Sequence, residues 1–320
     1  MISSSTAGID LNLLLTAALL LAGITSVACG AVPTTEPVES EDSMFWFNTI
    51  SLTLGPAILL GILLTGSWKL PPSARPTAWR IPLELGGLIF AFSILMSGLG
   101  GWLAIRFLAG MVNEDSMLAA SGVANIGTYL GGALPLVFMG MMWRKLPQPT
   151  GSEHPRSMGL SLLIGLGAII LMLPAIEMSS IVGNTIQRWF DGGSDEMIGH
   201  ETLKMLVDGR KDVWWWVVAG SAVICAPLVE EPLYRGIIQQ SLRRLKIKRW
   251  WAITLTAGLF AGMHVPVLPD ATMMAGLSAL FICGVVFGWI RERTGQLAGA
   301  IFAHMIFNAF NLTLAILLTG

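Results

Sequence analysis

The chain of 320 residues is 54% hydrophobic and only 12% charged, with a mean hydropathy of +0.70 and a formal net charge of −1. A soluble domain carries about 25% charged residues, so this composition excludes a soluble globular protein and indicates an integral membrane protein. A net charge so close to zero also argues against nucleic acid as a partner.

Apolar stretches long enough to cross a bilayer recur along the whole chain. A transmembrane helix needs about 20 mainly apolar residues, and the sequence offers about nine such runs. They lie near 11–32, 45–66, 81–105, 117–142, 158–182, 213–234, 250–268, 271–290 and 297–318. The predicted fold class is therefore all-α, a polytopic integral membrane protein of about nine transmembrane helices.

Lysine and arginine are distributed unevenly over the connections between these runs. With a cytoplasmic N-terminus, most basic residues fall in cytoplasmic loops, above all in the run from Arg243 to Arg249. The positive-inside rule therefore predicts a cytoplasmic N-terminus and an extracytoplasmic C-terminus. This topology suits a bacterial plasma membrane, with membrane lipid as an expected partner. We expect the first run to be an uncleaved helix; the alternative is a signal peptide, because Ser26-Val-Ala-Cys29 loosely resembles a lipoprotein cleavage box.

Two adjacent glutamates end the apolar run that begins at Trp214. A charge at mid-membrane costs at least about 2.5–3.5 kcal/mol, so such acids usually have a function, although a pair of interfacial charges is the simpler alternative. Glu231 and Arg235 are spaced i,i+4 with the acid first, which favours an intrahelical ion pair. Successive helical residues point about 100° apart, so Glu230 faces elsewhere and lacks this cation. An unpaired, partly desolvated carboxylate suits a general base near neutral pH.

Two of the four histidines lie within predicted spans, each in an i,i+4 pair: Phe260 with His264, and His304 with Asn308. This spacing places both members of a pair on one helix face. A lone buried histidine is usually a satisfied core residue, but several polar groups in apolar helices must find hydrogen-bond partners in hydrocarbon. We therefore expect four polar side chains to converge on one cavity, namely those of Glu230, His264, His304 and Asn308.

The three motifs together resemble those of the intramembrane endopeptidases grouped as CAAX proteases and bacteriocin-processing enzymes, the CPBP or Abi family. The family pattern is Glu-Glu-x-x-x-Arg, then Phe-x-x-x-His, then His-x-x-x-Asn, found here in that order at 230–235, 260–264 and 304–308. A small departure is Tyr234, where Phe is usual. The resemblance covers residues 213–311 and implies an endopeptidase that cleaves a membrane-associated protein or peptide.

Carried over to this sequence, the resemblance implies that Glu230 and His264 activate the attacking water. It implies that His304 and Asn308 stabilise the oxyanion. The chemistry agrees, because a glutamate base aided by a histidine can deprotonate water, and one oxyanion donor is typically worth about 10²–10³ in rate. Whether the substrate is a CAAX-type prenylated protein is not contained in the sequence.

A catalytic metal is open at this point. Glu230, His264 and His304 would supply three protein ligands to a zinc ion, with water in the fourth position. The helical His-Glu-x-x-His spacing of common zinc proteases is absent, and the family's architecture implies a metal-free glutamate mechanism. We therefore expect no cofactor, with zinc as the alternative.

The motifs also suggest a division of the chain. Residues 1–182 form an unassigned N-terminal membrane module of about five helices, 183–212 an extracytoplasmic loop, and 213–320 a protease core of about four helices. Glu231 and Arg235 are implied to support the core structurally. A non-catalytic scaffold or immunity factor of the same fold is the main alternative, although a scaffold has no need of the costly polar set. A proton-coupled transporter is a weaker alternative, because no paired repeats are visible.

Overall fold

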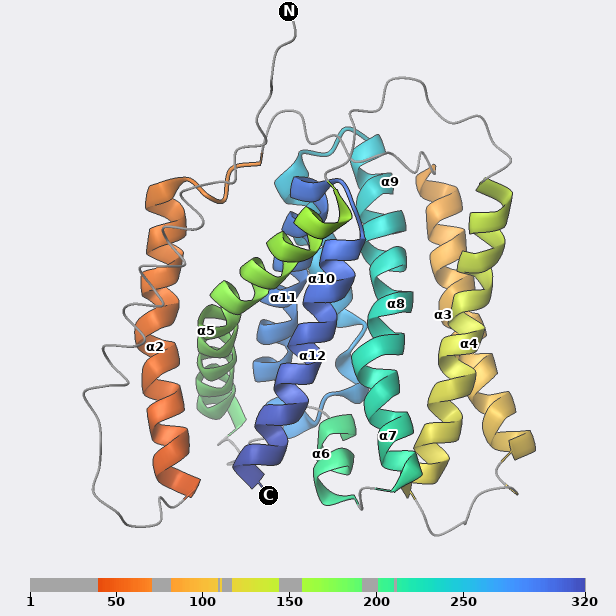
Figure 1. Cartoon of the computed structure of the whole chain (residues 1–320), viewed down its shortest axis with the longest axis horizontal. Helices are drawn as coiled ribbons and strands as arrows, with labels where there is room; N and C mark the ends of the chain where they lie inside the picture. The colour runs from red at the N-terminus through yellow and green to blue at the C-terminus, as the bar shows by residue number, and fades with distance from the viewer. Residues whose placement is uncertain are drawn as a thin grey trace, which may run out of the picture.

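The computed structural model describes residues 40–70, 82–108, 110, 117–143, 157–191, 201–209 and 212–319. Every regular element in these ranges is a helix (Figure 1). Eight helical stretches are long and apolar enough to cross a membrane: Trp46–Thr65, Leu83–Leu108, Met117–Met141, Met158–Phe190, Val213–Arg244, Arg249–Val267, Asp270–Thr294 and Ala298–Leu317. They confirm the all-α polytopic class and match eight of the predicted spans. The first predicted span, 11–32, lies outside the described residues.

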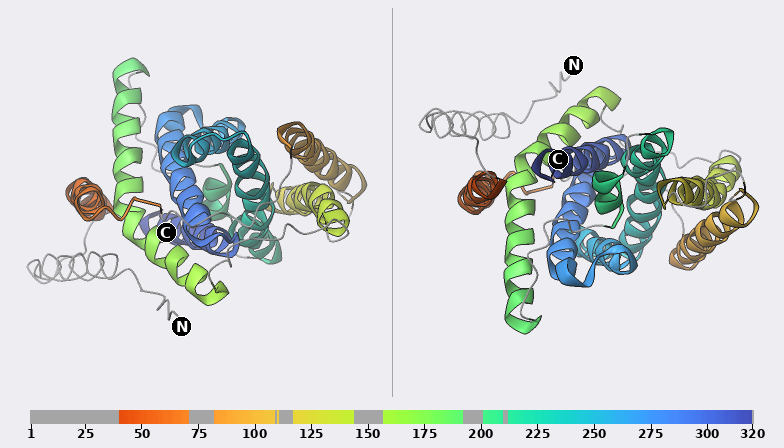
Figure 2. Two further views of the ribbon diagram at one scale, coloured as in Figure 1. Left: turned by 90° about the horizontal axis from the view of Figure 1, so that it is seen from above. Right: turned by 90° about the horizontal axis from the view of Figure 1, so that it is seen from below.

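Three helices flank the central bundle. Helix α2 (Ser40–Thr65) packs against α5 on one side, whereas α3 (Leu83–Leu108) and α4 (Met117–Trp143) pack along each other on the other side (Figures 1 and 2). Glycines allow α3 and α4 to touch backbone to backbone. A Cβ added at Gly127 would collide with the Gly100 carbonyl, and one at Gly131 with the Met96 carbonyl. Small residues are the usual means of close helix contact in lipid, where no hydrophobic effect draws helices together.

Gly131→Val is therefore expected to force α3 away from α4 and to lower thermal stability, because overpacking typically costs about 1–3 kcal/mol. Thermal unfolding of detergent-purified protein measures the effect. Gly98→Val is the matched control, because a Cβ at this α3 position has nothing within 4 Å. Equal unfolding temperatures for the two variants would contradict the backbone contact.

Helix α5 (Met158–Asp191) joins the flanking helices to the core. It extends into the stretch predicted as a loop from 183, and its bend (Figure 2) is explained by the internal Pro174, which cannot donate a backbone hydrogen bond. Helix α5 packs on α11 and α12, and Ile169 and Ile176 are fully buried in that interface. A helix assigned by sequence to the N-terminal module thus forms part of the wall of the predicted protease core.

One continuous helical span carries the glutamate pair. It consists of α7 (Val213–Gly220), the π-helical segment η2 (Ser221–Cys225), α8 (Ala226–Glu231), the π-helical segment η3 (Pro232–Ile238) and α9 (Gln239–Arg244). Asp212 caps its start, accepting hydrogen bonds from the backbone of Trp214 (2.9 Å) and Trp215 (3.0 Å). Single π-helical turns within helices often occur at functional sites, and here two of them bracket Glu230 and Glu231.

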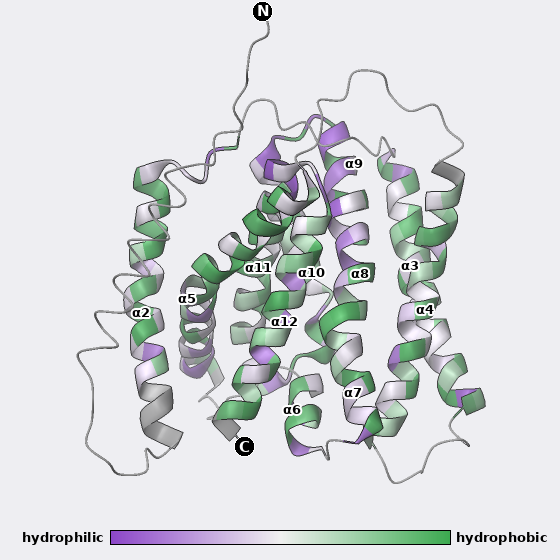
Figure 3. Ribbon diagram, in the orientation of Figure 1, coloured by the Kyte–Doolittle hydropathy of each residue, from purple (hydrophilic) through white to green (hydrophobic). Residues whose placement is uncertain are grey.

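The remaining elements complete the core. Helix α6 (Glu201–Asp208) packs beneath the bundle, where Leu206 accepts a hydrogen bond from Trp215 Nε1 (2.7 Å). Helix α10 (Arg249–Gly262) is followed by the short 3₁₀ segments η4 (Val265–Val267) and η5 (Asp270–Thr272), then by α11 (Met273–Thr294) and α12 (Ala298–Thr319). Hydrophilic residues gather at the α9 end, whereas α2, α3 and α4 are mainly hydrophobic (Figure 3).

Candidate active site

The Glu231 carboxylate contacts Arg235 on its own span and His304 on α12. Its Oε1 accepts a hydrogen bond from Arg235 Nη1 (2.8 Å) and lies 2.9 Å from His304 Nδ1 on α12. Arg235 also donates from Nη2 to the carbonyl of Gly284 on α11 (3.2 Å). Both charged side chains are fully buried. The ion pair predicted from their spacing is therefore present, and it connects the glutamate helix to α11 and α12.

Aromatic rings enclose the Arg235 guanidinium. Its Cζ lies 4.6 Å from the ring centroid of Phe260, 5.2 Å from that of Phe287 and 5.7 Å from that of Tyr234. Such cation–π contacts gain strength where water is excluded. Phe260 also contacts the His304 ring at 5.7 Å, edge to face. The phenylalanine of the Phe-x-x-x-His motif is thus a spacer that packs between the arginine and the histidine.

Glu230 lies on the other side of His304. The His304 Nε2 atom is 4.0 Å from Glu230 Oε2, and the Glu230 side chain keeps 22% of its surface exposed. An ionised carboxylate can only accept, so His304 donates Nδ1–H to Glu231 and turns Nε2 toward Glu230. The 4.0 Å separation is too long for a direct hydrogen bond, and Glu230 Oε2 has no other partner. Two glutamates adjacent in sequence therefore have different surroundings: Glu231 is bonded to Arg235 and His304, whereas Glu230 Oε2 has no hydrogen-bond partner.

His264 follows the end of α10 in a turn and is held by the last turns of that helix. Its Nδ1 lies 2.7 Å from the Phe260 carbonyl oxygen, and its ring packs against the Phe260 ring at 4.7 Å. A carbonyl can only accept, so Nδ1 carries the proton and the neutral ring presents the Nε2 lone pair. That tautomer can accept a hydrogen bond from a water molecule. His264 reaches His304 only through Phe260, whose ring contacts both histidines.

Asn308 contacts the backbone of η2. Its Nδ2 donates to the Ala222 carbonyl over 2.8 Å. In the π-helical register the Ala226 N–H bonds to the Ser221 carbonyl instead of that of Ala222, and the next residue, Pro227, has no N–H to offer. The η2 segment and the proline thus leave the Ala222 carbonyl without its helical donor, and Asn308 supplies one.

The structure tests how the predicted residues are grouped. It brings Glu230, Glu231 and Arg235 into one cluster with His304, whereas His264 is linked to them through Phe260 and Asn308 contacts η2. Within the described residues, no three histidine, cysteine or acidic side chains are grouped to hold a metal ion. The proposed zinc ligands, Glu230 with the two histidines, therefore gain no geometric support.

Helix α4, outside the stretch that carries the motifs, also reaches the site. Asn125 Nδ2 donates to Ser221 Oγ in η2 (3.0 Å). A signal for this residue was available, because Asn125 is a polar residue in an apolar run. Its partner is 96 residues away in sequence, however, and could not be named from spacing alone.

Buried polar groups on the glutamate span and on α11 form a row of contacts that extends from the site toward α9. Gln239, one turn beyond Arg235, donates to the Gly288 carbonyl and to Glu292 Oε1 on α11, each at 3.2 Å. The Glu292 carboxylate is fully buried and lies 3.7 Å from Arg243 Nε and 3.6 Å from Arg249 Nε. The i,i+4 series 231, 235, 239, 243 on one helix thus faces the i,i+4 series 284, 288, 292 on α11.

We expect Gln239→Leu to lower stability by about 1–3 kcal/mol, because it removes the donor to a buried carboxylate and a buried carbonyl. Thermal unfolding in detergent measures the loss. Gln240→Leu is the matched control: Gln240 is also buried, but its Nε2 makes only a 3.4 Å hydrogen bond to the Arg235 carbonyl within its own helix. A larger loss of stability in Gln240→Leu than in Gln239→Leu would argue against a stabilising role for the Gln239 hydrogen bonds to α11.

The segment that carries these residues is similar to known proteins. Residues 212–310 match the family model described as type II CAAX prenyl endopeptidase Rce1-like. The chain is 23% identical to the Bacillus subtilis (strain 168) protein named "Putative membrane peptidase YdiL" over 205 residues, which cover 64% of this chain and 76% of the relative. No solved structure gives a significant match. The matched segment contains all three motifs, and both comparisons support a similarity of residues 212–310 to CPBP-family proteases.

Proposed function

We propose that the protein is an intramembrane endopeptidase that hydrolyses a peptide bond of a membrane-associated protein or peptide with water activated by Glu230. The observation that supports this most directly is the His304 ring held between the two glutamates, 2.9 Å from Glu231 and 4.0 Å from Glu230. If both glutamates had only a structural role, each carboxylate should have hydrogen-bond partners, because an unbonded carboxylate is costly in a membrane interior. The remaining groups are of the types that amide hydrolysis needs: a base, an orienting imidazole and amide and imidazole donors.

In the proposed reaction Glu230 takes a proton from water while His264 Nε2 accepts a hydrogen bond from the same molecule and orients it. The water oxygen forms a bond to the peptide carbonyl carbon, and the carbonyl oxygen becomes an oxyanion. The carbon–nitrogen bond then breaks, and the leaving amine takes the proton that Glu230 received. The products are a carboxylic acid and an amine, and Glu230 returns to its ionised form.

His304 and Asn308 are the proposed oxyanion donors. Because His304 Nδ1–H is bonded to Glu231, donation from Nε2 requires the doubly protonated ring, whose charge the Glu231 carboxylate offsets. Asn308 uses one N–H on the Ala222 carbonyl, and its amide carries a second N–H for the substrate oxygen. Glu231 and Arg235 are thus positioning residues: Glu231 holds the His304 ring at Nδ1, and Arg235 holds the Glu231 carboxylate.

We infer the membrane setting from the distribution of charge. Glu230 lies inside the Val213–Arg244 span, so the scissile bond must reach a site flanked by lipid-facing helices. Basic residues cluster at the α9 end, including Arg243, Arg244 and Arg249. By the positive-inside rule we propose that this end faces the cytoplasm of a bacterial cell, with the C-terminus outside.

Hydrolysis by detergent-purified protein tests the proposal. A peptide library, together with a CAAX reporter in prenylated and unprenylated forms, should yield defined cleavage products, and a strong chelator should leave the rate unchanged. Cleavage lost with the chelator and restored by zinc would convert the assignment to a metalloprotease with Glu230, His264 and His304 as candidate ligands. Folded protein that cleaves none of the substrates would favour the scaffold alternative.

A further inference from the structure

Helix α4 lies along the glutamate span (Val213–Arg244) from its first turn to the level of the glutamate pair. A Cβ added at Gly122 would lie 2.7 Å from the Trp214 ring. A Cβ added at Gly132 would lie 3.3 Å from Val229 Cγ1, one residue before the pair. Because both glycines leave little room for a side chain, the distance between α4 and the span is fixed on either side of η2.

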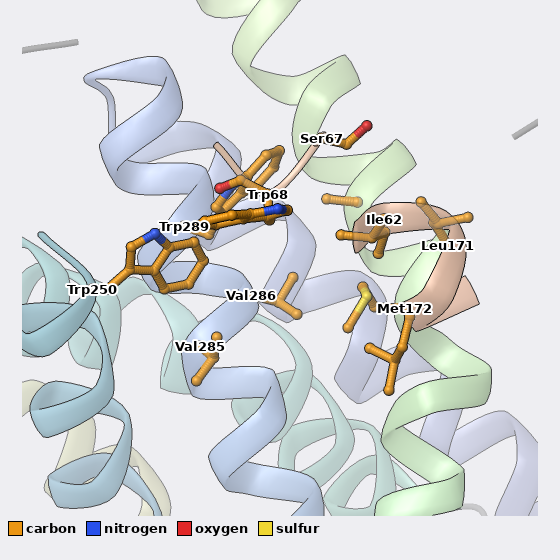
Figure 4. A pocket seen from close by; sticks show the side chains of 11 residues that line it. Ile62, Ser67, Trp68, Leu171, Met172, Trp250, Val285, Val286 and Trp289 are labelled. Atoms are coloured by element: carbon orange, nitrogen blue, oxygen red, sulfur yellow. The ribbon is translucent and has the colours of Figure 1, made fainter. Parts of the chain in front are cut away.

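The opposite flank of the bundle fits the core less closely. A cavity of about 120 Å³ lies where α2 meets α5, α10 and α11, and side chains such as Trp68, Met172 and Trp289 line it (Figure 4). None of the described residues that line it belongs to the glutamate span or to α12. Of the two flanks, α4 is therefore the one that can fix the position of the catalytic groups.

Asn125 of α4 bonds to the residue at which the span changes its helical register. Its Nδ2 donates to Ser221 Oγ (3.0 Å), and the Ser221 hydroxyl donates in turn to the Val218 carbonyl (2.7 Å). The Ser221 carbonyl accepts the N–H of Ala226, which is the bond that defines the π-helical turn. Since the single hydroxyl proton is used on Val218, the Ser221 oxygen is left to accept from Asn125, and α4 thereby holds the first residue of η2.

The next residue of η2 is the one that bonds to Asn308. In an α-helical register the Ala226 N–H would return to the Ala222 carbonyl and compete with the Asn308 amide. In the π-helical register this carbonyl stays available, and Asn308 Nδ2 donates to it over 2.8 Å. Two asparagines from two helices, α4 and α12, therefore hold neighbouring residues of one turn, and the orientation of the Asn308 amide depends on the register of that turn.

We propose that Asn125 is a positioning residue for the reaction proposed above. By holding Ser221 it keeps η2 in its π-helical register, so that the Ala222 carbonyl fixes one N–H of the Asn308 amide and leaves the second for the substrate oxygen. The inference rests on the proposed peptidase function, and it gives a part in the site to α4, which lies outside the family-matched residues 212–310. Because Asn125 acts through η2 and Asn308, its removal should slow the chemical step more than it weakens substrate binding.

The test compares two alanine variants of α4 in full-length, detergent-purified protein with a cleavable reporter. Asn125→Ala should lower kcat about 10–100-fold and change KM by less than about twofold, because a misplaced oxyanion donor slows chemistry without loss of ground-state binding. Leu130→Ala is the matched control and should retain wild-type kcat, because Leu130 lies on the same helix with 65% of its surface exposed. Asn125→Leu, which keeps the side-chain volume, serves as the second variant if Asn125→Ala does not fold.

A double-mutant cycle separates positioning from general destabilisation. In an Asn308→Ala background, Asn125→Ala should have little further effect on kcat, because its effect is transmitted through Asn308. Ser221→Ala should reproduce the loss seen in Asn125→Ala, because it removes the same hydrogen bond. Multiplicative losses from Asn125→Ala and Asn308→Ala, or equal kcat values for Asn125→Ala and Leu130→Ala, would overturn the proposal.

Hydrogen exchange of residues 221–226 gives a readout that does not depend on activity. The η2 amides should exchange faster in Asn125→Ala than in Leu130→Ala, because the π-helical turn has lost its contact with α4. Equal exchange in the two variants would overturn the hold on η2. A wild type that cleaves no substrate would instead refute the peptidase assignment, and the exchange rates would then decide by themselves whether Asn125 holds η2.

Discussion

Glu230→Gln is expected to lower turnover by about 10²–10⁴-fold while leaving the fold intact. Glutamine keeps the volume of the side chain and removes its basicity. The fold should tolerate the change, because Glu230 Oε2 has no hydrogen-bond partner and lies 4.0 Å from His304 Nε2. Hydrolysis of a cleavable reporter by purified variant and wild type, with thermal unfolding alongside, measures both effects.

Two further glutamine variants serve as comparisons. Glu84→Gln replaces an exposed acid in the first turn of α3 and should retain wild-type turnover. Glu231→Gln removes the charge that binds both Arg235 and His304, so it should reduce stability as well as activity. Wild-type turnover in Glu230→Gln would eliminate this residue as the base, whatever the other variants do.

The sequence predicted the main helices well because their signal is local. Runs of about 20 apolar residues are required to cross a bilayer, and the eight described spans begin and end close to the predicted positions, except at the ends of the glutamate span and of α5, which continues to Phe190 instead of 182. The span that carries the glutamates is an exception: it continues to Arg244 instead of 234, because polar residues such as Gln239 are buried against α11 and do not end the helix. Hydropathy alone cannot distinguish a buried polar face from an interfacial one.

Within the site, contacts inside one helix were predictable and contacts between helices were not. The Glu231–Arg235 pair follows from i,i+4 spacing and is present at 2.8 Å. The hydrogen bond between Glu231 and His304 joins residues 73 positions apart and shows that Glu231 does more than support its helix. Pro232 has no backbone N–H, and the π-helical segment η3 begins at this residue. The other register change, at η2, could not be predicted from spacing, and there Asn308 bonds to the carbonyl that Pro227 cannot serve.

Arg235→Ala is expected to reduce stability by about 3–5 kcal/mol and to lower the yield of folded protein, because breaking a buried ion pair leaves an uncompensated charge. The guanidinium is fully buried, bonds to Glu231 and to the Gly284 carbonyl, and lies 4.6 Å from the Phe260 ring centroid. Its removal therefore strands the Glu231 carboxylate and leaves a carbonyl and an aromatic face without their cation.

A graded series makes the Arg235 measurement decisive. Arg235→Lys keeps the charge, but a single ammonium cannot reproduce the planar fork that reaches Glu231 and Gly284 together, so its unfolding temperature should lie between those of wild type and Arg235→Ala. Arg106→Ala removes an exposed arginine from the last turn of α3 and should leave stability unchanged, because exposed charges contribute little. Wild-type unfolding temperature and yield in Arg235→Ala would refute a buried ion pair. In that case Glu231 would have to be held through His304 alone, and the choice of Glu230 instead of Glu231 as the base would lose its structural basis.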